Sequence, residues 1–349
     1  MEPERRAEEA PASGREPLVS VIIPCRNEAP TLPLVLDSLL EQELDFPMEV
    51  IFADGGSTDE SAEVVEKHPL SKKVPVKMLK LPPAQSGMAT SKNVAVSQSR
   101  GRIILFMQAD CRVRDSQALN KVVQAMKAPG VVGTDFTLIH AEKYFHEFDF
   151  WGQHYQSFAY GLVVPHTGDT KFNAVSRETF DAMGGYNEKF ALAGEDIEFN
   201  GRLVKLGRVV DSNVVVEHVH GYGKNFTPLG ILKKFCRNAE VSGSVAPAFM
   251  KYREQYITQF PAVIRQFLKT VIVTVAALVS FVPALFPWPL LLMMAAGVLW
   301  QKKAFLHIRN WRLVLLPFYG LAYMYCYVFF YWRGMIFGKP LYDFDNKMR

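Results

Sequence analysis

The chain of 349 residues lacks the marker patterns of several protein classes. Its four cysteines are scattered, with no C-x-x-C pair and no cysteine–histidine spacing, so neither a disulfide framework nor a zinc site is predicted. The turn after the first apolar strand, PCRNEAP, has no glycine, whereas a dinucleotide-binding turn needs G-x-G-x-x-G so that the backbone can approach a pyrophosphate. Reduced thiols are therefore expected, and a dinucleotide-dependent dehydrogenase is disfavoured.

The N-terminus also lacks an apolar run. The first 17 residues, MEPERRAEEAPASGREP, are polar and charged, which predicts a disordered tail and not a signal peptide. Acidic residues are scarce at the other end of the chain. Residues 1–223 carry a net charge of −8 and residues 224–349 a net charge of +12, which together give the overall +4. The basic part of the chain is also its apolar part.

Two long stretches near the C-terminus contain no charged residue. Thr270–Trp300 has 31 residues and Leu313–Trp332 has 20, and each is long enough for a hydrocarbon core of about 30 Å. We therefore expect a transmembrane region of two to three helices over residues 269–338, followed by a polar tail over 339–349. Prolines within the first stretch make it either one kinked crossing or a hairpin of two short helices.

The connector between the two stretches, residues 301–312, carries four Lys and Arg residues, which favours the cytoplasmic side and supports the hairpin. The second stretch then either crosses once more or dips and returns. Amphipathic juxtamembrane helices are expected over residues 224–268. In Thr227–Ala239, apolar residues line one side with basic residues nearby, a pattern typical of a helix lying in a membrane interface.

Strand and helix alternate in the N-terminal part. LVSVIIP, MEVIFADGG, VKMLKL and RIILFM predict strands, and a helix with leucines and valine on one face follows the first. Ser57 and Glu60 have the spacing of a capping box that opens a helix through Val65. The fold class is therefore α/β, a doubly wound sheet with a parallel core.

Polar residues follow three of these strands. They are Asn27 and Glu28, residues 54–59, and residues 108–110. Ligands of such sheets bind beyond the carboxyl ends of the strands, so all three groups are expected to face one crevice. The Asp54 carboxylate can accept a hydrogen bond from a base or a ribose hydroxyl, and a metal held at Asp110 would neutralise a diphosphate.

Five segments, in this order, resemble the successive motifs of family 2 glycosyltransferases with the GT-A fold: VSVIIPCRNE, EVIFADGGSTDES, GMATSKNVA, GRIILFMQAD and GGYNEKFALAGEDIEFNGRL. The resemblance spans residues 18–223 and predicts a GT-A catalytic domain there. With its apolar C-terminal region, the chain is most similar to bacterial succinoglycan and exopolysaccharide enzymes of the ExoA type. The Q-x-x-R-W motif of processive cellulose- and hyaluronan-synthase relatives is absent, so transfer of one sugar per acceptor is expected.

The resemblance also implies a divalent metal, Mg²⁺ or Mn²⁺. The family usually carries D-x-D after the strand RIILFM, and its second acid binds the metal on the donor diphosphate. Asp110 stands at this second position, whereas Gln108 replaces the first acid, so the metal site has one carboxylate fewer. Many GT-A enzymes place a metal-contacting histidine after the E-D motif. His218 and His220 lie on one face of a strand by its two-residue period, and we prefer His218.

The E-D motif of the family is the expected catalytic centre. In relatives its aspartate removes the proton of the acceptor hydroxyl, which assigns this role to Asp196 and makes Glu195 an orienting group. The alternative is that both acids only favour the N-terminus of the following helix through its dipole. Residues that match the family's nucleotide-contacting positions are Pro24, Asn27, Glu28, Asp54, Ser57 and Lys92.

Two classes of function follow. The first is inverting, non-processive transfer of a sugar from a nucleotide-sugar donor to a lipid-linked polyprenyl-diphosphate saccharide at the cytoplasmic membrane face, with polyprenyl-phosphate sugar synthesis as its alternative. The second is a catalytically lapsed nucleotide-sugar-binding membrane scaffold, which Gln108 favours and the retained Asp110 and Asp196 disfavour. The expected partners are donor, acceptor and membrane lipids. Nucleic acid is not expected, because the aromatic-rich stretch from Tyr144 to Thr170 holds no Lys or Arg. Its aromatic part, Tyr144 to Tyr160, is either an acceptor lid, a membrane-facing helix or ordinary core.

Overall fold

The computed structural model describes residues 18–140, 142–165, 170–188, 194–251 and 260–337. The chain divides into two compact units. The first holds the residues up to Leu138, with Val164–Glu188 and Leu203–His220. The second holds Ile139–Val163, residues 194–202 and the chain from Gly221 onward. Two internal segments therefore leave the first unit, which a single boundary at residue 223 does not anticipate.

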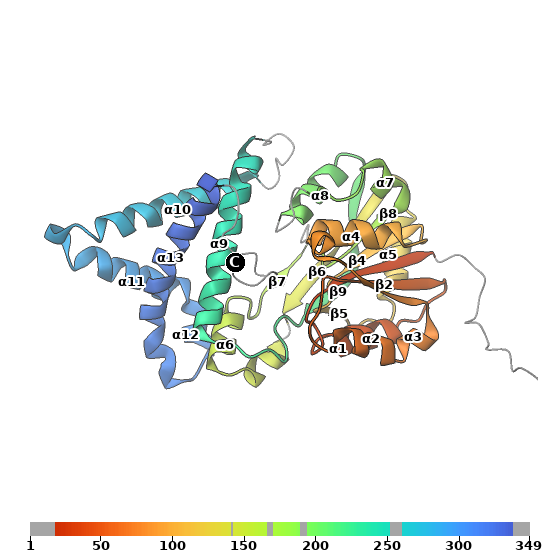
Figure 1. The fold of residues 1–349 in the computed structure, drawn as a ribbon, viewed down its shortest axis with the longest axis horizontal. Helices are drawn as coiled ribbons and strands as arrows, with labels where there is room; N and C mark the ends of the chain where they lie inside the picture. The colour runs from red at the N-terminus through yellow and green to blue at the C-terminus, as the bar shows by residue number, and fades with distance from the viewer. Residues whose placement is uncertain (1–17, 141, 166–169, 189–193, 252–259, 338–349) are drawn as a thin grey trace, which may run out of the picture. The chain divides into compact units, whose positions relative to one another are not determined.

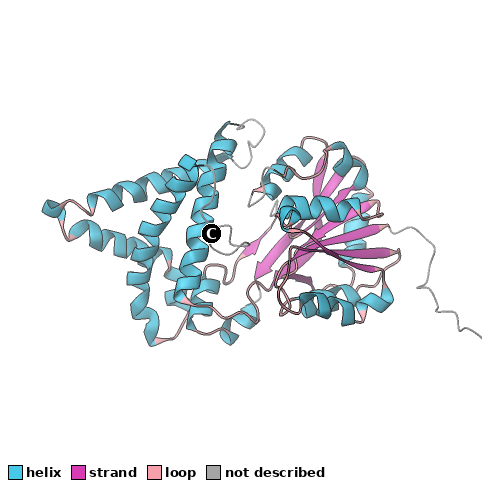
Figure 2. Cartoon of the chain, viewed as in Figure 1, coloured by secondary structure: helices cyan, strands magenta, loops and turns pink. Residues whose placement is uncertain are grey.

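The described strands form one nine-stranded mixed sheet, shown in magenta in Figure 2, with the order β3-β2-β1-β4-β8-β6-β9-β5 and β7 paired to β6. Its parallel part consists of β1 (Val19–Cys25), β2 (Met48–Asp54), β3 (Val76–Lys80) and β4 (Ile103–Met107). The other strands are β5 (Cys111–Val113), β6 (Val131–His140), β7 (Val163–Val164), β8 (Phe172–Ser176) and β9 (Arg208–His218). β8 is antiparallel to β4, and β5 is antiparallel to β9. The predicted parallel core is confirmed, and an antiparallel half extends it.

Three of the four parallel strands, β1, β2 and β4, are buried because their sequences are mostly apolar on both faces, whereas the edge strand β3 is partly exposed. Every residue of β1, β2 and β4 is buried, as expected for strands covered on two sides. Helices α1 to α3 lie on one side of these strands and α4 on the other (Figure 1). The helices of this unit are α1 (Leu32–Leu40), α2 (Ser61–Lys67), α3 (Leu70–Lys73), α4 (Met88–Ser97), α5 (Ala118–Met126) and α7 (Arg177–Ala182). The loops that follow these strands therefore start from a well-packed core.

The predicted capping box is wrong. Helix α2 begins at Ser61 and not after Ser57, and its N-cap, Glu60, makes no side-chain capping bond. The Ser57 hydroxyl is engaged elsewhere, because it donates to Asp54 Oδ1 at 2.7 Å. Asp59 instead accepts from the backbone N–H of Ser61 at 3.1 Å. A strong local hydrogen bond in the loop has replaced the helix cap.

The second unit is helical. Its helices are α6 (Phe150–Ser157), α8 (Glu195–Leu203, with its last residue in the first unit), α9 (Pro228–Lys251), α10 (Phe260–Val279), α11 (Trp288–Trp300), α12 (Lys302–His307) and α13 (Leu316–Phe337). A break between α10 and α11 falls where the sequence places its prolines, at the 3₁₀ turn Pro283–Leu285. Among the described residues, one segment, Trp311–Phe337, has the length and apolar composition to cross a membrane.

The aromatic-rich segment of the second unit is partly core. Phe145 and Phe150 are buried in one cluster with Ala304, Ile308 and Leu316. His154 on α6 is fully buried as well, and its Nε2 lies 2.7 Å from Oε1 of Gln301. These contacts join α6 to the segment that links α11 and α13.

Candidate functional site

The first part of the site is the carboxylate of Asp54, the last residue of β2. Asp54 is buried, and its Oδ1 accepts hydrogen bonds from the backbone N–H groups of Gly56 (3.2 Å) and Ser57 (2.8 Å). The Ser57 hydroxyl donates to the same oxygen, so this oxygen shapes the loop. Gly56 has φ of 89°, a backbone conformation that glycine adopts without a steric penalty. Asp54 therefore fixes the turn at residues 54–57, and all three of these hydrogen bonds go to its Oδ1.

The loop after β1 is tied to the loop after β2. Asn27, with φ of 56°, accepts from the backbone N–H of Thr58 through Oδ1 at 2.8 Å, and its own N–H donates to the Ser57 hydroxyl at 3.0 Å. The N–H of Glu28 donates to the Ser61 hydroxyl at 2.9 Å, in a part-buried contact. Asparagine tolerates this left-handed conformation better than most residues. The structure thus brings together two of the three polar groups expected at one crevice.

The third polar group, residues 108–110 after β4, is hydrogen-bonded to the start of α1 through Thr31. The sequence alone did not single out this threonine. Thr31 is fully buried, and its hydroxyl lies 2.8 Å from the carbonyl oxygen of Ala109. The same hydroxyl lies 3.1 Å from Oε2 of Glu28. Threonine at the start of an apolar helix is an ordinary capping residue, so only the folded contact reveals this bridge.

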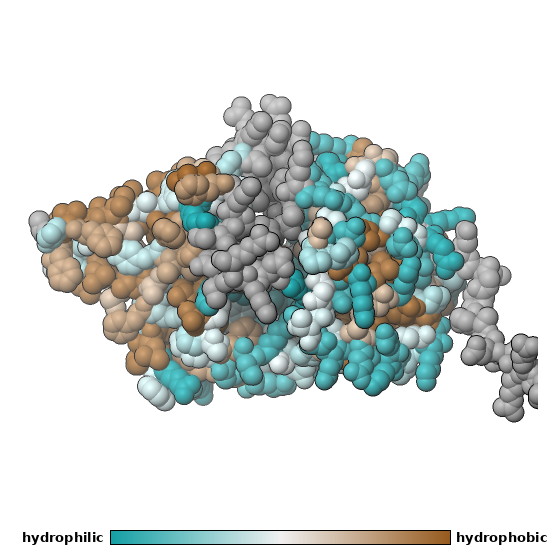
Figure 3. Space-filling view, in the orientation of Figure 1, coloured by the Kyte–Doolittle hydropathy of each residue, from teal (hydrophilic) through white to brown (hydrophobic). Residues whose placement is uncertain are grey.

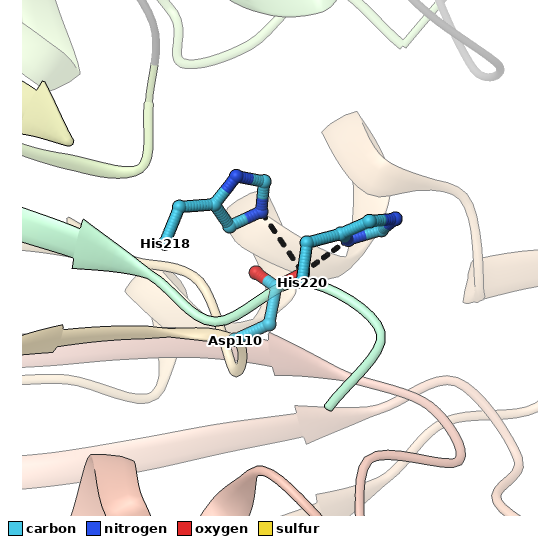
Figure 4. A group of neighbouring side chains, drawn as sticks. All are labelled: Asp110, His218 and His220. Carbon is cyan, nitrogen blue, oxygen red and sulfur yellow. Dashed lines mark hydrogen bonds and ion pairs between the residues drawn. The ribbon is translucent and has the colours of Figure 1, made fainter. Parts of the chain in front are cut away.

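The chemically most informative cluster lies where β4 ends, beside the end of β9. Oδ2 of Asp110 lies 3.2 Å from Nε2 of His218 and 2.8 Å from Nδ1 of His220, as Figure 4 shows. Strand pairing explains the meeting, because Cys111 is in register with His218 and the N–H of Val219 donates to the Asp110 carbonyl at 2.8 Å. The sequence placed both histidines on one strand, but β9 ends at His218 and His220 lies in the turn that follows. Both imidazoles still reach the same carboxylate oxygen.

The electrostatics of the cluster are strong. Burial alone would raise the pKa of Asp110, but the charges and hydrogen bonds of His218 and His220 hold the pKa of this carboxyl well below its usual range. The carboxylate therefore stays ionised in an enclosed place, with only 13% of its side chain exposed. When the two imidazoles are neutral, their nitrogens and this carboxylate can serve together as ligands of a cation.

The donor atoms of these three residues fit a divalent metal. One ligand atom from each of Asp110, His218 and His220 lies within 4.8 Å of the other two, and the cluster is part-buried. Imidazole and carboxylate together suit a transition metal such as Mn²⁺ better than Mg²⁺, which prefers oxygen ligands. The structure brings both histidines to the carboxylate and gives no ground for preferring His218 over His220.

Three other predicted donor-site residues lie at different depths. Gln108 is partly exposed, and its backbone N–H donates to the carbonyl of Lys171 at 3.2 Å. Pro24 lies inside β1 and is buried. Lys92 on α4 is fully buried, with Nζ 2.6 Å from Oγ1 of Thr170 and 4.7 Å from the ring centroid of Tyr186. Contact between this enclosed ammonium and a donor phosphate stays a prediction.

The predicted catalytic acids open α8. Glu195 and Asp196 are the first two residues of the helix, and Gly194 before them has φ of 83°. Glu195 is 7% exposed and Asp196 is more open. Acids in the first helical turn also interact favourably with the helix dipole, so this position agrees with both readings of the pair. Their part in catalysis stays a prediction.

The mixed sheet, with its acid at the end of β4, defines a protein with the GT-A glycosyltransferase fold. Solved structures support this at low sequence identity. The mannosyltransferase PcManGT of Pyrobaculum calidifontis, in complex with GDP-Man and Mn²⁺, matches with a TM-score of 0.50 and 20% identity over 93% of this chain and 90% of that one. TarS residues 1–349 of S. aureus, in complex with UDP-GlcNAc, match with a TM-score of 0.51 and 16% identity over 90% of both chains.

Residues 20–189 match glycosyl transferase family 2, so the chain carries a domain of that family. A curated relative, the O-antigen biosynthesis protein RfbC of Myxococcus xanthus, is 27% identical over 215 residues. The match covers 56% of this chain but only 16% of RfbC, a much longer protein. The family expected from the five motifs is confirmed for this domain. The ExoA-type specificity stays a prediction.

Proposed function

We propose that the chain is an inverting, non-processive glycosyltransferase that moves a sugar from a nucleotide-sugar donor to a lipid-linked saccharide at the cytoplasmic face of a membrane. The observation that carries the proposal is the Asp110–His218–His220 cluster at the end of β4, whose Asp110 lies within the residues that match glycosyl transferase family 2. Ligands of open α/β sheets bind beyond the carboxyl ends of the strands, where this cluster lies.

The loops after β1 and β2 form the proposed nucleotide site. Asp54, Ser57 and Asn27 already fix these loops by hydrogen bonds, which gives a preorganised edge for a base and a ribose. PcManGT and TarS were each solved with a nucleotide sugar, which supports a donor of this class. The sugar and the nucleotide remain open to a donor screen.

The cluster would hold Mn²⁺ through one carboxylate oxygen and two imidazole nitrogens. A bound divalent cation supplies charge that offsets the diphosphate leaving group of the donor. The residues themselves keep Asp110 ionised and hold its side chain beside β9. Gln108 adds no charge, so in this proposal the two histidines supply the further ligand atoms beside Asp110, the acid at the metal-binding position of D-x-D.

Asp196 is the proposed general base, with Glu195 as its orienting neighbour. An acceptor hydroxyl becomes an effective nucleophile when a positioned carboxylate takes its proton during attack. Attack from the face opposite the leaving diphosphate inverts the anomeric carbon. The partial exposure of Asp196 suits a group that must reach an incoming acceptor.

The apolar, basic helices of the second unit support a lipid-linked acceptor and a membrane location. Exposed hydrophobic residues gather on α10, α11 and α13, among them Ile272, Leu292, Phe318 and Phe337. Polyprenyl phosphate as the acceptor, giving a polyprenyl-phosphate sugar, is the second candidate, and the same surface supports it. A lapsed, donor-binding scaffold is the third.

One assay separates these candidates. The purified full chain in vesicles receives radiolabelled nucleotide sugars, Mn²⁺, and either polyprenyl phosphate or a lipid-linked saccharide extract. Label that enters the lipid phase only with the saccharide extract supports the proposal. Label on polyprenyl phosphate itself supports the synthase. Donor binding by calorimetry without transfer or donor hydrolysis, across the full screen, would establish the scaffold.

A further inference from the structure

Helices α9 and α13 run side by side in the same direction. Near their starts, the Tyr319 hydroxyl donates to the carbonyl of Pro228 at 3.0 Å. One or two turns further on, the ring centroids of Phe235 and Tyr323 are 5.1 Å apart. Both contacts pair an early residue of α9 with an early residue of α13, so the helices are parallel.

Close packing continues toward the other ends of the two helices. A Cβ atom on Gly243 would overlap the carbonyl of Tyr331, and a Cβ atom on Gly334 would overlap the carbonyl of Glu240. Two glycines at such a crossing let helix backbones approach directly. Because α9 follows α13 from end to end, α13 cannot enter a membrane without α9.

The charged residues of α9 disfavour its insertion into the hydrocarbon core of a membrane. It carries Lys233, Lys234 and Arg237 within two turns, and the side chains of Lys233 and Asn238 are exposed. A Lys or Arg residue at the bilayer centre is strongly unfavourable. A crossing by α13 would therefore draw several cations into the hydrocarbon together.

Helix α13 also exposes an apolar face that α9 leaves uncovered. Phe318, Phe329 and Ile336 on this face are 65%, 60% and 70% exposed. Gly320, Tyr331 and Gly334 of the same helix are buried in the unit. One apolar face and one covered face are what a helix lying in the membrane surface requires. The 27 apolar residues of Trp311–Phe337 meet the length criterion for a crossing, but the packing of α9 opposes one.

The α10–α11 hairpin is too short to cross as well. Helix α11 has 13 residues, about 20 Å, and the uncharged part of α10, Thr270–Val279, spans about 15 Å. The hydrocarbon core is about 30 Å thick, so each arm reaches through about one leaflet. The tip is apolar and open, with Phe281 74% and Phe286 63% exposed.

The hairpin extends away from α13 in Figure 1, and Figure 3 shows hydrophobic residues over its surface. Cations flank both of its ends. Arg265 and Lys269 are exposed before the uncharged stretch, and Lys302, Arg309 and Arg312 are exposed after it. Each Lys or Arg near an anionic membrane surface adds to the electrostatic attraction. The apolar tip of the hairpin and the cations at its base match the acyl chains and the anionic headgroups of one leaflet.

We infer that the second unit attaches to one leaflet only: the α10–α11 hairpin dips into it, and α13 lies along its surface with α9 on the aqueous side. This deepens the proposed function, from which it takes the membrane location, and it replaces the expected transmembrane crossings with a monotopic anchor. Because no helix crosses the membrane in this arrangement, every loop of the second unit would stay on the side of the membrane that holds the nucleotide-sugar donor.

Depth measurements test the inference on the full chain. Cys326, the natural cysteine that is not buried, is changed to Ser, and single cysteines replace Phe286, Phe318, Phe329, Ile336 or Asn238. Each carries a fluorescent maleimide in phosphatidylethanolamine–phosphatidylglycerol vesicles, with quenchers placed either near the headgroups or near the acyl ends. Val215→Cys, an exposed apolar position on β9, is the matched control.

The expected pattern is strongest deep quenching at Phe286→Cys, equal shallow quenching at the three α13 positions, and no quenching at Asn238→Cys or Val215→Cys. Deep quenching at Phe329→Cys between shallow Phe318→Cys and Ile336→Cys would mean that α13 crosses, and would overturn the inference. Absence of quenching at Phe286→Cys would also overturn it. Transfer is assayed on the same vesicles: the expected depths without transfer would reject the proposed function alone, and transfer with a crossing pattern would reject the anchor alone.

Discussion

Asp110 and His220 lie 110 positions apart in the chain, yet Oδ2 of one and Nδ1 of the other are 2.8 Å apart. The contact depends on the antiparallel pairing of β5 with β9, which carries His218 and His220 to the end of β4. The single acid at this strand end therefore has two imidazoles beside it, one at the end of β9 and one in the turn after it. We propose that these three side chains together form the metal site.

The first prediction is that Asp110 is required for metal binding. Asp110→Ala should lower Mn²⁺ affinity by more than about tenfold and abolish Mn²⁺-dependent transfer, because the charged ligand is lost. Asp115→Ala is the matched control, since Asp115 pairs with Lys121 at 2.6 Å and lies outside the cluster. Isothermal calorimetry with MnCl₂ measures the affinity. Full activity of Asp110→Ala in excess chelator would refute the assignment.

The second prediction concerns the replaced acid. Gln108→Asp should preserve or increase metal affinity, because it restores a carboxylate two residues before Asp110. The rise should appear in the Mn²⁺ titration, with Gln108→Asn as the neutral control of similar polarity. A loss of affinity in the aspartate variant alone would show that the amide makes a contact that the site needs.

The third prediction treats the two histidines separately. His218→Ala and His220→Ala should each weaken Mn²⁺ binding, by about tenfold or more, because each removes one nitrogen from the cluster. Affinity is measured for both variants and for the double variant. If His220→Ala alone has an effect, only that imidazole is a ligand, and the three-residue site is wrong.

The sequence predicted the parallel half of the sheet because β1, β2 and β4 are continuous apolar runs with turn residues after them. It also placed polar residues after β1, β2 and β4, and the loops that carry them are joined by hydrogen bonds. It did not anticipate the antiparallel half or the bridge by Thr31, which depend on contacts between distant strands and loops. The capping box failed because Asp54 competes for the Ser57 hydroxyl.

The C-terminal region shows the same limit of local patterns. An uncharged run reports length and composition, which made Leu313–Trp332 a plausible crossing. The run itself does not indicate which helix packs against it. Only the packing of Gly243 against Tyr331 places the basic helix α9 beside this run. Whether an apolar helix spans a membrane is decided by what covers it, and that information is tertiary.

The fourth prediction is a pH dependence of stability from His154. Burial lowers the pKa of this histidine to about 4 from 6.5, and its Nδ1 has no hydrogen-bond partner. The folded state therefore resists protonation, while the unfolded state takes up a proton below pH 6.5. Stability falls as pH drops from 6.5 toward 4, by about 2 kcal/mol at pH 5.

His154→Gln should remove this part of the pH dependence. The loss of unfolding free energy between pH 7.5 and pH 5 should be about 2 kcal/mol smaller in the variant than in the natural chain. Denaturant unfolding in detergent at the two pH values measures it, and His146→Gln, at an exposed position, is the control. Equal losses in the natural chain and His154→Gln would show that the imidazole is not buried neutral.

The fifth prediction concerns Asp196, because it separates an active transferase from a lapsed relative. Asparagine has the shape of aspartate but cannot take a proton from the acceptor hydroxyl. Asp196→Asn should therefore lower single-turnover transfer by about 10²- to 10⁴-fold, the usual contribution of a positioned base. Donor affinity should stay within a few-fold, because the proposed donor contacts come from Asp54, Asp110 and the loop after β1.

Both quantities are measured on one preparation, donor binding by calorimetry and transfer by rapid mixing. Glu198→Gln serves as the control on the same helix, since this acid is buried and its Oε2 pairs with Arg202 at 2.7 Å. A structural disturbance of α8 would affect the control as well, through the loss of that ion pair. If transfer and donor binding fall together in Asp196→Asn, the aspartate supports the donor site or the helix. If neither falls, the proton goes to another group, because an amide at position 196 cannot have accepted it.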